Sequence, residues 1–229
     1  MSALASMLRE QSFAAGPELQ AIQAESKALQ NPPVPKSNGK VHPLSIVLAL
    51  RSLVDDDTIV ACDMGPNHIW MARHFFEFEP YKLPFSNGQQ TLGVGIPWAM
   101  AASFTYPAKK VVAVVGDGGF LYSSMELETA VRSKLNITVL VFRDGGYNMV
   151  AFQQELIYGR TSGTDFGNPD FVKYAESFGC VGMRVNKPDE LLPTLRKALE
   201  TPGVVAVDIP TDYSKNVEIG EHVIPEAWD

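Results

Sequence analysis

The sequence has little of what marks secreted, membrane-spanning or nucleic-acid-binding proteins. Only two of its 229 residues are cysteine, Cys62 and Cys180, and both lie in apolar surroundings without metal-ligand spacing. No apolar run reaches the length that crosses a bilayer, and the first residues lack a secretory signal pattern. No basic run accompanies the net charge of −7, which argues against a nucleic-acid surface. We therefore expect reduced thiols, a cytoplasmic protein, and neither a membrane nor a nucleic acid as partner.

Apolar sequence broken by tight loops is abundant instead. With 45% hydrophobic and 20% charged residues, the chain is long enough for one substantial core. Short β-branched runs alternate with helical segments, which predicts an α/β fold: a doubly wound parallel sheet with helices on both faces. The first strand is almost wholly apolar, so we expect it to be central in the sheet. The expected strands span residues 58–62, 110–115, 137–142, 180–185 and 204–209.

The composition divides the chain into three parts. Residues 1–41 are predicted to form an N-terminal helical and extended tail, with helix-forming composition at 3–8 and 18–29 followed by a proline-rich linker. Residues 42–213 hold the alternating strands and helices. Residues 214–229 are predicted to be an irregular C-terminal tail. We therefore expect one domain between two tails.

Two aspartates follow consecutive strands. Asp117 lies in Gly-Asp-Gly-Gly-Phe directly after the strand at 110–115, and Asp144 lies in Arg-Asp-Gly-Gly-Tyr-Asn-Met after the strand at 137–142. One crossover, with a helix expected at about 123–133, joins these strands, so both carboxylates should meet at the carboxyl edge of the sheet. Hard oxygen ligands of this kind suit a magnesium ion bound to a diphosphate. A bare Gly-Asp-Gly is also common in ordinary βαβ units with acidic loop ends, which leaves both interpretations open.

The wider pattern resembles a known family. Asp144 follows Asp117 by 27 residues, a spacing similar to that between the two metal ligands in the cofactor signature of thiamine diphosphate enzymes. Most of that superfamily carries Asn at the second position, and Asp there resembles the catabolic acetolactate synthase branch. The residues after Gly119 and after Gly146 also resemble that branch. Gly145 departs from the Asn or Ala expected at its position.

The resemblance implies a set of cofactor residues. It places Mg²⁺ on Asp117, Asp144 and the carbonyl of Gly146. No residue for proton transfer is assigned by it. The residues that would contact thiamine diphosphate are Asn67, Gln90, Leu92, Gly118, Gly119, Asn148 and Met149.

A glycine-rich segment at residues 85–98 is the second informative stretch. Its glycines allow a backbone to approach a flat ligand closely, although they would equally suit a close-packed helix start. Beside the family resemblance, the segment is similar to the loop that contacts the aminopyrimidine ring. There the side chain of Leu92 would hold the cofactor in its bent conformation, and the carbonyl of Gln90 would accept from the amino group.

The implied function is that of the diphosphate-binding part of an acetolactate synthase, which joins two pyruvates to 2-acetolactate with loss of CO₂. In such enzymes a pyrimidine-binding domain supplies the glutamate that activates the cofactor, and no glutamate here sits in a matching context. We therefore expect a homo-oligomer or a complementary chain as partner, and pyruvate or a related 2-oxoacid as substrate. Two alternatives stay open: a subunit of a two-chain 2-oxoacid decarboxylase, and a cofactor-binding or structural remnant without turnover.

Overall fold

The computed structural model describes residues 16–30, 32–35, 39–76 and 80–216. The chain forms two compact units, residues 1–33 and residues 34–229. In the first unit, α2 (Pro17–Gln30) confirms the helix expected at 18–29. The helix expected at 3–8 lies outside the described residues. No helix in the described part of the chain combines the length and the apolar character that a membrane span requires.

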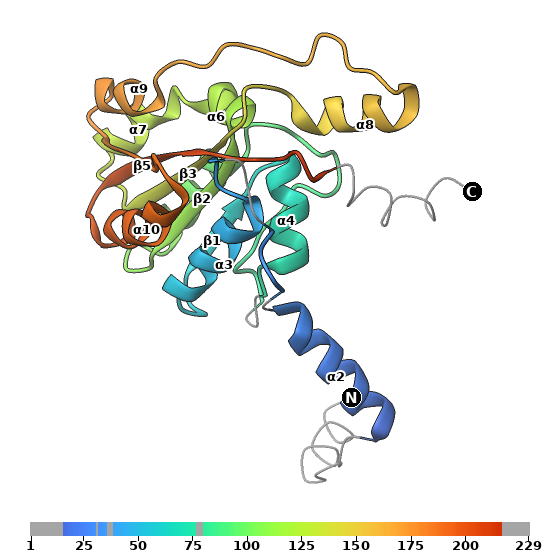
Figure 1. The fold of residues 1–229 in the computed structure, drawn as a ribbon. Helices are drawn as coiled ribbons and strands as arrows, with labels where there is room; N and C mark the ends of the chain where they lie inside the picture. The colour runs from blue at the N-terminus through green and yellow to red at the C-terminus, as the bar shows by residue number, and fades with distance from the viewer. Residues whose placement is uncertain (1–15, 31, 36–38, 77–79, 217–229) are drawn as a thin grey trace, which may run out of the picture. The chain divides into compact units, whose positions relative to one another are not determined.

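A parallel five-stranded sheet is the centre of the second unit (Figure 1). Its order is β1-β2-β3-β5-β4, and each neighbouring pair is parallel. This confirms the expected fold class. The strands are β1 (Ile59–Cys62), β2 (Val111–Gly116), β3 (Ile137–Arg143), β4 (Val181–Arg184) and β5 (Val204–Pro210).

Helices cover both faces of this sheet. On one face lie α3 (Pro43–Leu53), α4 (Pro66–His74) and α10 (Leu191–Glu200), whose apolar side chains share one buried cluster, and the short 3₁₀ helix η1 (Pro188–Glu190) directly precedes α10. The other face carries α5 (Gly95–Thr105), α6 (Asp117–Ser123), α7 (Glu126–Arg132) and α9 (Phe171–Ser177). α8 (Asn148–Tyr158) leaves the sheet, and the chain returns from its far end to α9 in a long segment (Figure 1).

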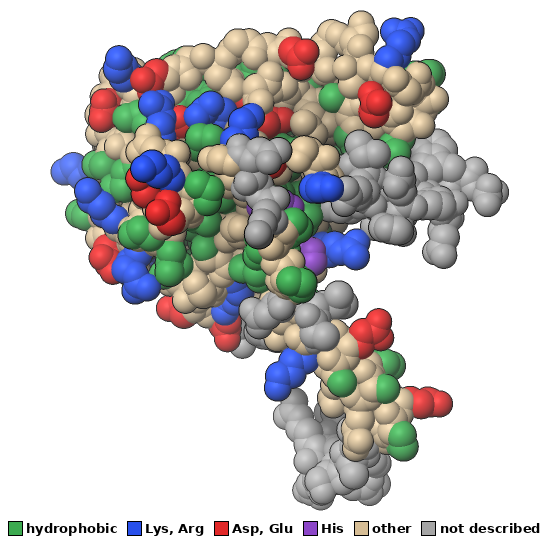
Figure 2. All heavy atoms as spheres, in the orientation of Figure 1, with side chains coloured by type: hydrophobic (Ala, Val, Ile, Leu, Met, Phe, Trp, Pro, Cys, Tyr) green, Lys and Arg blue, Asp and Glu red, His purple; other side chains and the backbone are tan. Residues whose placement is uncertain are grey.

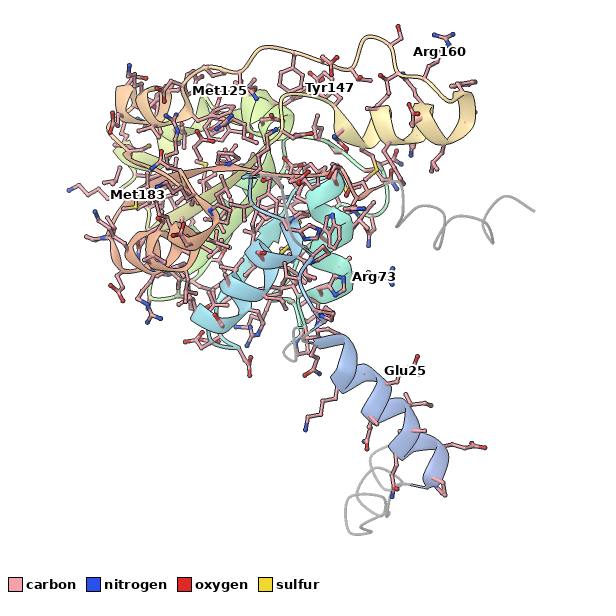
Figure 3. The ribbon with its side chains drawn as sticks, viewed as in Figure 1. Glu25, Arg73, Met125, Tyr147, Arg160 and Met183 are labelled. Carbon is pink, nitrogen blue, oxygen red and sulfur yellow. The ribbon has the colours of Figure 1, made fainter. Side chains whose placement is uncertain are left out.

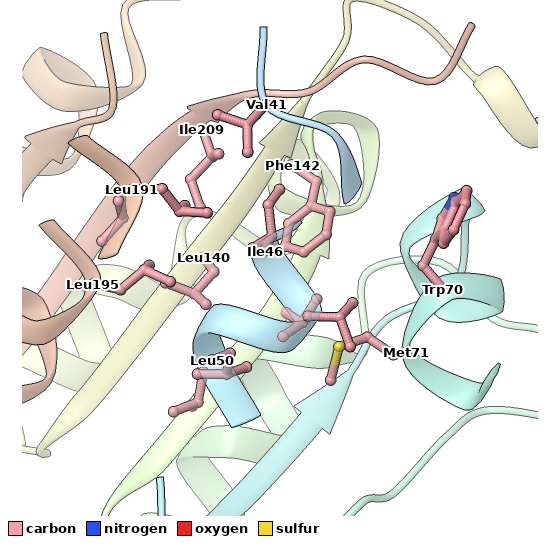
Figure 4. Packing of buried hydrophobic residues seen from close by; sticks show 14 of the residues in the cluster. Val41, Ile46, Leu50, Trp70, Met71, Leu140, Phe142, Leu191, Leu195 and Ile209 are labelled. Carbon is pink, nitrogen blue, oxygen red and sulfur yellow. The ribbon is translucent and has the colours of Figure 1, made fainter. Parts of the chain in front are cut away.

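Alternation along the strands divides the core into two clusters. In β3, Leu140 and Phe142 belong to the cluster under α3 and α10, whereas Val139 and Val141 belong to the cluster under α5 and α9. Figure 4 shows Leu140 and Phe142 packed near Ile46 of α3. Because strands buried on both faces carry apolar residues at every position, the continuous apolar runs were a correct signal for this sheet.

Two expectations about local structure are wrong, one of them only in part. The first strand, β1, is at an edge of the described sheet rather than central. Its outer side is nevertheless covered, because the amides of Val60 and Cys62 donate to the carbonyls of Lys82 and Pro84 at 2.7 and 3.1 Å. An extended segment therefore gives this edge strand the burial of a central one.

The second expectation, a helix at about 123–133, is confirmed in part by α7 and is wrong about where helical structure begins. The structure has two short helices there, α6 starting at Asp117 and α7 ending at Arg132. Glycines disfavour a helix by propensity, so the sequence pattern placed the start after Gly118 and Gly119. In the structure α6 contains both glycines, because tight neighbours leave no room for side chains there.

Charged side chains do not gather into one patch on the face seen in Figure 2, where Lys and Arg alternate with Asp and Glu. Both cysteines are free and buried, as expected for core thiols. Burial raises the pKa of the Cys180 thiol to about 11, so this residue stays protonated.

Candidate cofactor site

A cavity of about 200 Å³ lies where β1, β2 and β3 end. The loops after parallel strands meet at one edge of the sheet, which is where open α/β folds bind their ligands. Eight residues line the cavity besides the predicted site residues, and they come from these loops, from the start of α8 and from the segment after β5: Met64, Gly65, Pro66, Gly116, Phe142, Tyr147, Val150 and Tyr213. All ten residues that the resemblance assigned to cofactor or metal line this cavity: Asn67, Gln90, Leu92, Asp117, Gly118, Gly119, Asp144, Gly146, Asn148 and Met149.

Asp117 is the buried anchor of the cavity. Its side chain is 1% exposed, and its Oδ2 accepts from the amides of Asp144 and Gly145 at 3.1 and 2.7 Å. Asn168 Nδ2 donates to the same oxygen at 2.6 Å. Oδ1 accepts only the amide of Gly118 among the recorded hydrogen bonds of described residues, at 2.8 Å. One carboxylate oxygen thus fixes the loop after β3, while the other keeps lone-pair capacity for a cation.

Asp144 carries a second carboxylate into the same place. Its burial and the nearby charge of Asp117 raise its pKa to about 7, while a hydrogen bond from Asn148 and the charge of Lys40 lower it. Two buried carboxylates that repel each other are stabilised when a divalent cation lies between them.

The donor set fits a magnesium ion that shares its ligands with a phosphate group. Among the described residues, no cluster of three or more His, Cys, Asp or Glu side chains could hold a metal alone. Two carboxylates and the carbonyl of Gly146 would leave the remaining octahedral positions for phosphate oxygens and water. The hard oxygen chemistry of this set suits Mg²⁺ and excludes a thiolate or imidazole metal site.

Glycines are required at two positions of the loops after β2 and β3, which carry Asp117 and Asp144. A Cβ at Gly119 would lie 2.4 Å from Asp63 Oδ2 and 3.4 Å from Leu92 Cδ1, so the helix start packs directly against both residues. Gly145 has a φ of +96°, in the region that L side chains rarely adopt. This explains the departure at Gly145: its backbone must turn so that its amide reaches Asp117.

The loop after β1 approaches the cavity through Asn67. This residue is fully buried, and its Nδ2 donates to the carbonyl of Asp63 at 2.9 Å, while its Oδ1 has no hydrogen-bond partner among the described residues. Pro66 opens α4 and has no amide hydrogen to offer. The side-chain amide nitrogen of Asn67 already donates inside the protein. The group of Asn67 that could donate to a diphosphate is therefore its backbone N–H, in the first turn of α4.

Asp63 holds the glycine-rich loop in place, a role that the sequence did not reveal. Its fully buried carboxylate accepts the amide of Gly93 with both oxygens at 3.0 Å, the amide of Val94 at 3.4 Å and the amide of Met64 at 2.8 Å. Burial raises the pKa of Asp63, and these backbone amides oppose that rise. The carboxylate therefore ties the end of β1 to the loop that carries Leu92.

The same loop contains a backbone in a sparsely populated conformation. Gln90 has a φ of +52°, which is uncommon for a residue with a side chain. The turn is closed by the amide of Gln90 donating to the carbonyl of Ser86 at 3.0 Å and by the amide of Thr91 donating to Ser86 Oγ at 3.1 Å. Such strain persists where neighbouring contacts fix the chain, and these contacts hold the backbone of Gln90 at the cavity.

Aromatic residues cover the loops that carry Asp117 and Asp144. Tyr147 lies where the chain enters α8, beside α6 (Figure 3), and its ring is 4.8 Å from that of Phe166. The amide of Tyr147 donates to the carbonyl of Thr164 at 2.8 Å, and the amide of Phe166 donates to the carbonyl of Gly145 at 3.1 Å. The segment after α8 therefore packs on the loop of Asp144, and it brings Asn168 to Asp117.

Three residues of this site had no signal in the motifs. Asp63 and Asn168 contact predicted site residues directly, and Tyr213 lines the cavity from the segment after β5. A side-chain network reaches the same region: Trp70 Nε1 donates to Asn216 Oδ1 at 3.0 Å, and Asn216 Nδ2 donates to Asn148 Oδ1 at 3.3 Å. All these contacts join segments far apart in sequence, so spacing could not predict them.

The cavity is built to hold and orient a ligand more than to transfer protons. Its ionisable lining side chains are Asp117, Asp144, Tyr147 and Tyr213. The two aspartates are candidate metal ligands, and the environment raises the pKa of both tyrosines, so their hydroxyls stay protonated. The described lining thus offers metal ligands, backbone donors and apolar walls.

The sequence is similar to one family model and to several known proteins. A family model described as "Thiamine pyrophosphate enzyme, C-terminal TPP binding domain" matches residues 63–209. The chain is 52% identical over 196 residues to the acetolactate synthase of Bacillus subtilis (strain 168), an alignment covering 86% of this chain and 34% of the relative. It is 50% identical over 176 residues to the catabolic acetolactate synthase of Raoultella terrigena, covering 77% and 32%. The chain spans about a third of the length of these relatives.

Proposed function

The chain belongs to the thiamine pyrophosphate enzyme family through its C-terminal TPP-binding domain, and from this premise we propose that its cavity holds the magnesium diphosphate end of the cofactor in an acetolactate synthase. Asp117, Asp144 and the carbonyl of Gly146 hold Mg²⁺ in this proposal. The substrate is pyruvate or a related 2-oxoacid, as the names of the similar synthases suggest.

One observation carries the proposal. The ten residues named from the motif line a single cavity although they come from four separate segments of the chain. Inside it, Asp117 and Asp144 are close enough for the charge of one to raise the pKa of the other, and neither takes part in the recorded salt bridges of described residues. The charge of Lys40 lowers the pKa of Asp144 but leaves it raised to about 7, so a divalent cation that enters the cavity would stabilise the pair further.

The residues of this chain supply position and exclusion of water. Thiamine diphosphate, when bound, supplies the electron sink for decarboxylation of a 2-oxoacid and carboligation of the product. Asp63 fixes the glycine-rich loop, so that Gln90 and Leu92 line the cavity. Leu92 contributes an apolar wedge, and the backbone of the α6 start approaches the diphosphate without side chains in the way.

Proton transfer to the cofactor is assigned to a glutamate outside these residues, on a pyrimidine-binding domain in the same polypeptide or in a partner. Exposed apolar side chains on α8 support such an interface. Val150 and Ile157 are 46% and 65% exposed, and Phe152 is the one buried residue of this helix. An apolar helix face of this kind favours association with a partner, which we propose to be a second copy or a complementary chain.

Calorimetric titration with thiamine diphosphate tests the proposal. The chain should bind the cofactor only with Mg²⁺ present, and Asp117→Ala should weaken binding by about 100-fold or more because a metal ligand and a loop anchor are lost together. Asp189→Ala removes an exposed acid on η1 and is the matched control with unchanged affinity. Equal affinity of Asp117→Ala and the unaltered chain would overturn the assignment.

A further inference from the structure

Tyr213 places an unpartnered hydroxyl in the cavity wall. The residue is 7% exposed, and its ring belongs to the buried cluster under α3 and α10. Its hydroxyl oxygen is buried and has no hydrogen-bond partner among the described residues. The same side chain lines the cavity that contains Asp117 and Asp144.

A buried hydroxyl without a partner is unfavourable. Phenylalanine would fill the same apolar space without a polar atom to desolvate, so core packing alone does not explain a tyrosine here. Among the described residues none supplies a hydrogen bond to this hydroxyl, which leaves it available to a ligand that enters the cavity. At Tyr174, by contrast, the hydroxyl lies 3.0 Å from Ser124 Oγ and is satisfied within the protein.

The backbone around Tyr213 is held firmly in place. The amide of Val41 donates to the carbonyl of Pro210 at 2.8 Å, and the amide of Asp212 donates to the carbonyl of Val41 at 2.9 Å. On the other side, the amide of Asn216 donates to the carbonyl of Tyr213 at 2.9 Å. The hydroxyl is therefore presented by a fixed segment, as a preorganised binding group requires.

The charge of the surroundings determines what this hydroxyl can bind. Burial raises the pKa of Tyr213, and the nearby charges of Asp144 and Asp117 raise it further, so the group stays protonated and donates. A donor beside a metal site meets the oxygens that accompany the metal. Phosphate oxygens are strong acceptors, and hydrogen bonds to them are stronger than those between neutral groups.

We infer that the Tyr213 hydroxyl donates a hydrogen bond to an oxygen of the magnesium diphosphate group, making Tyr213 a cofactor-binding residue outside the sequence motif. The inference rests on the proposed function, because it takes the cavity to be the diphosphate site. It adds a contact from the segment after β5 to those from the loops after β1, β2 and β3.

Tyr213→Phe tests this directly, since it removes one oxygen and keeps the ring. Titrations would use thiamine diphosphate with Mg²⁺ and, as a smaller probe, inorganic pyrophosphate with Mg²⁺. Loss of one hydrogen bond to a charged group should weaken both by about 10- to 100-fold. Without any ligand, the denaturant midpoint of Tyr213→Phe should equal or exceed that of the unaltered chain, because an unsatisfied polar atom is gone.

Tyr174→Phe is the matched control. It removes a hydroxyl that is bonded within the protein, so it should lower the denaturant midpoint and leave both affinities unchanged. A lower midpoint for ligand-free Tyr213→Phe would show that its hydroxyl serves the fold, and this would overturn the inference.

Affinity separates the inference from the proposed function. If the unaltered chain binds both probes and Tyr213→Phe binds them equally well, the inference alone fails. If the unaltered chain binds neither probe at millimolar concentration, the diphosphate site fails and the inference fails with it.

Discussion

Two groups of acids, the buried Asp208 and the pair of buried Asp117 and half-buried Asp144, lie toward the carboxyl edge of the same sheet and differ in their partners. Asp208 of β5 has a side chain only 1% exposed, and it pairs with Arg143 at 2.6 Å and with Arg184 at 2.7 Å. Asp117 and Asp144 are satisfied by backbone amides and by asparagine side chains, and neither appears in the recorded ion pairs of described residues. One acid is complete within the chain, and the other two are not.

The difference shows how to separate a structural acid from a ligand-binding one. Arg143 and Arg184 belong to the strands on either side of β5, so Asp208 joins three neighbouring strands. At the cavity, the chain provides two carboxylates, and in our proposal a bound magnesium ion supplies their counter-charge. Removing a buried acid from its built-in cations destabilises the fold, whereas an acidic pair without such cations is a candidate binding site.

The largest effect is expected at Asp208. Asp208→Asn should lower the free energy of unfolding by about 3 kcal/mol, because it removes the carboxylate that pairs with Arg143 and leaves Arg184 with Asp170 alone. Chemical denaturation measures this loss. Binding of magnesium and thiamine diphosphate to the folded variant should be unchanged, and a large loss of affinity would break the distinction drawn here.

The opposite sign is expected at Asp144. At pH 8, Asp144→Asn should raise the free energy of unfolding of the metal-free chain by roughly 2 kcal/mol, since it removes one of two repelling buried charges. Denaturation with and without Mg²⁺ measures the change. Added Mg²⁺ should stabilise the unaltered chain more than it stabilises the variant, and a less stable metal-free variant would contradict the account.

The same residue predicts a pH dependence. The pKa of Asp144 is about 7 in the folded chain and 3.8 in its reference state, so the folded chain holds this proton more tightly. Stability from Asp144 is therefore full below about pH 4 and is lost as the pH rises through 7. The stability difference between Asp144→Asn and the unaltered chain should grow over this range without metal. A difference that is constant with pH would contradict the assignment.

Asp63 is an intermediate case, because backbone amides take the place of a cation. Asp63→Asn should lower the free energy of unfolding by about 1 kcal/mol. The neutral amide is a weaker acceptor for the loop amides than the carboxylate, but its burial costs less than burial of the charge that raises the pKa of Asp63. The loop with Leu92 would loosen. Affinity for thiamine diphosphate should therefore fall more than affinity for pyrophosphate, which lacks the ring that the Leu92 loop would contact. Equal losses of affinity would mean that the substitution acts on the loops of Asp117 and Asp144 instead.

The sequence allowed the general fold and the position of the cavity to be predicted because both depend on local patterns. Apolar runs identified every strand of the described sheet, and the order of strand and helix placed Asp117 and Asp144 at one edge. The edge position of β1 was missed, because an extended segment buries it as fully as a neighbouring strand would. Propensity likewise missed the start of α6 at Asp117, where tight packing requires glycines within the helix.

The residues that support the site could not be predicted in the same way. Asn168 reaches Asp117 across 51 residues of sequence, and Asp63 reaches Gly93 across 30. Tyr213 belongs to no motif, and its hydroxyl became informative only when the structure showed it buried without a partner. Contacts of this kind depend on tertiary packing, which spacing along the chain does not encode.

The contact between Gly119, Asp63 and Leu92 has a consequence for protein engineering. The start of α6 leaves no space for a methyl group against Asp63, and Asp63 in turn holds the loop of Leu92. The segments after β1, before α5 and after β2 therefore form one packed unit. A graft of this cradle onto another parallel sheet would have to transfer all three together, because an exchange of one alone would meet a clash or an unsatisfied carboxylate.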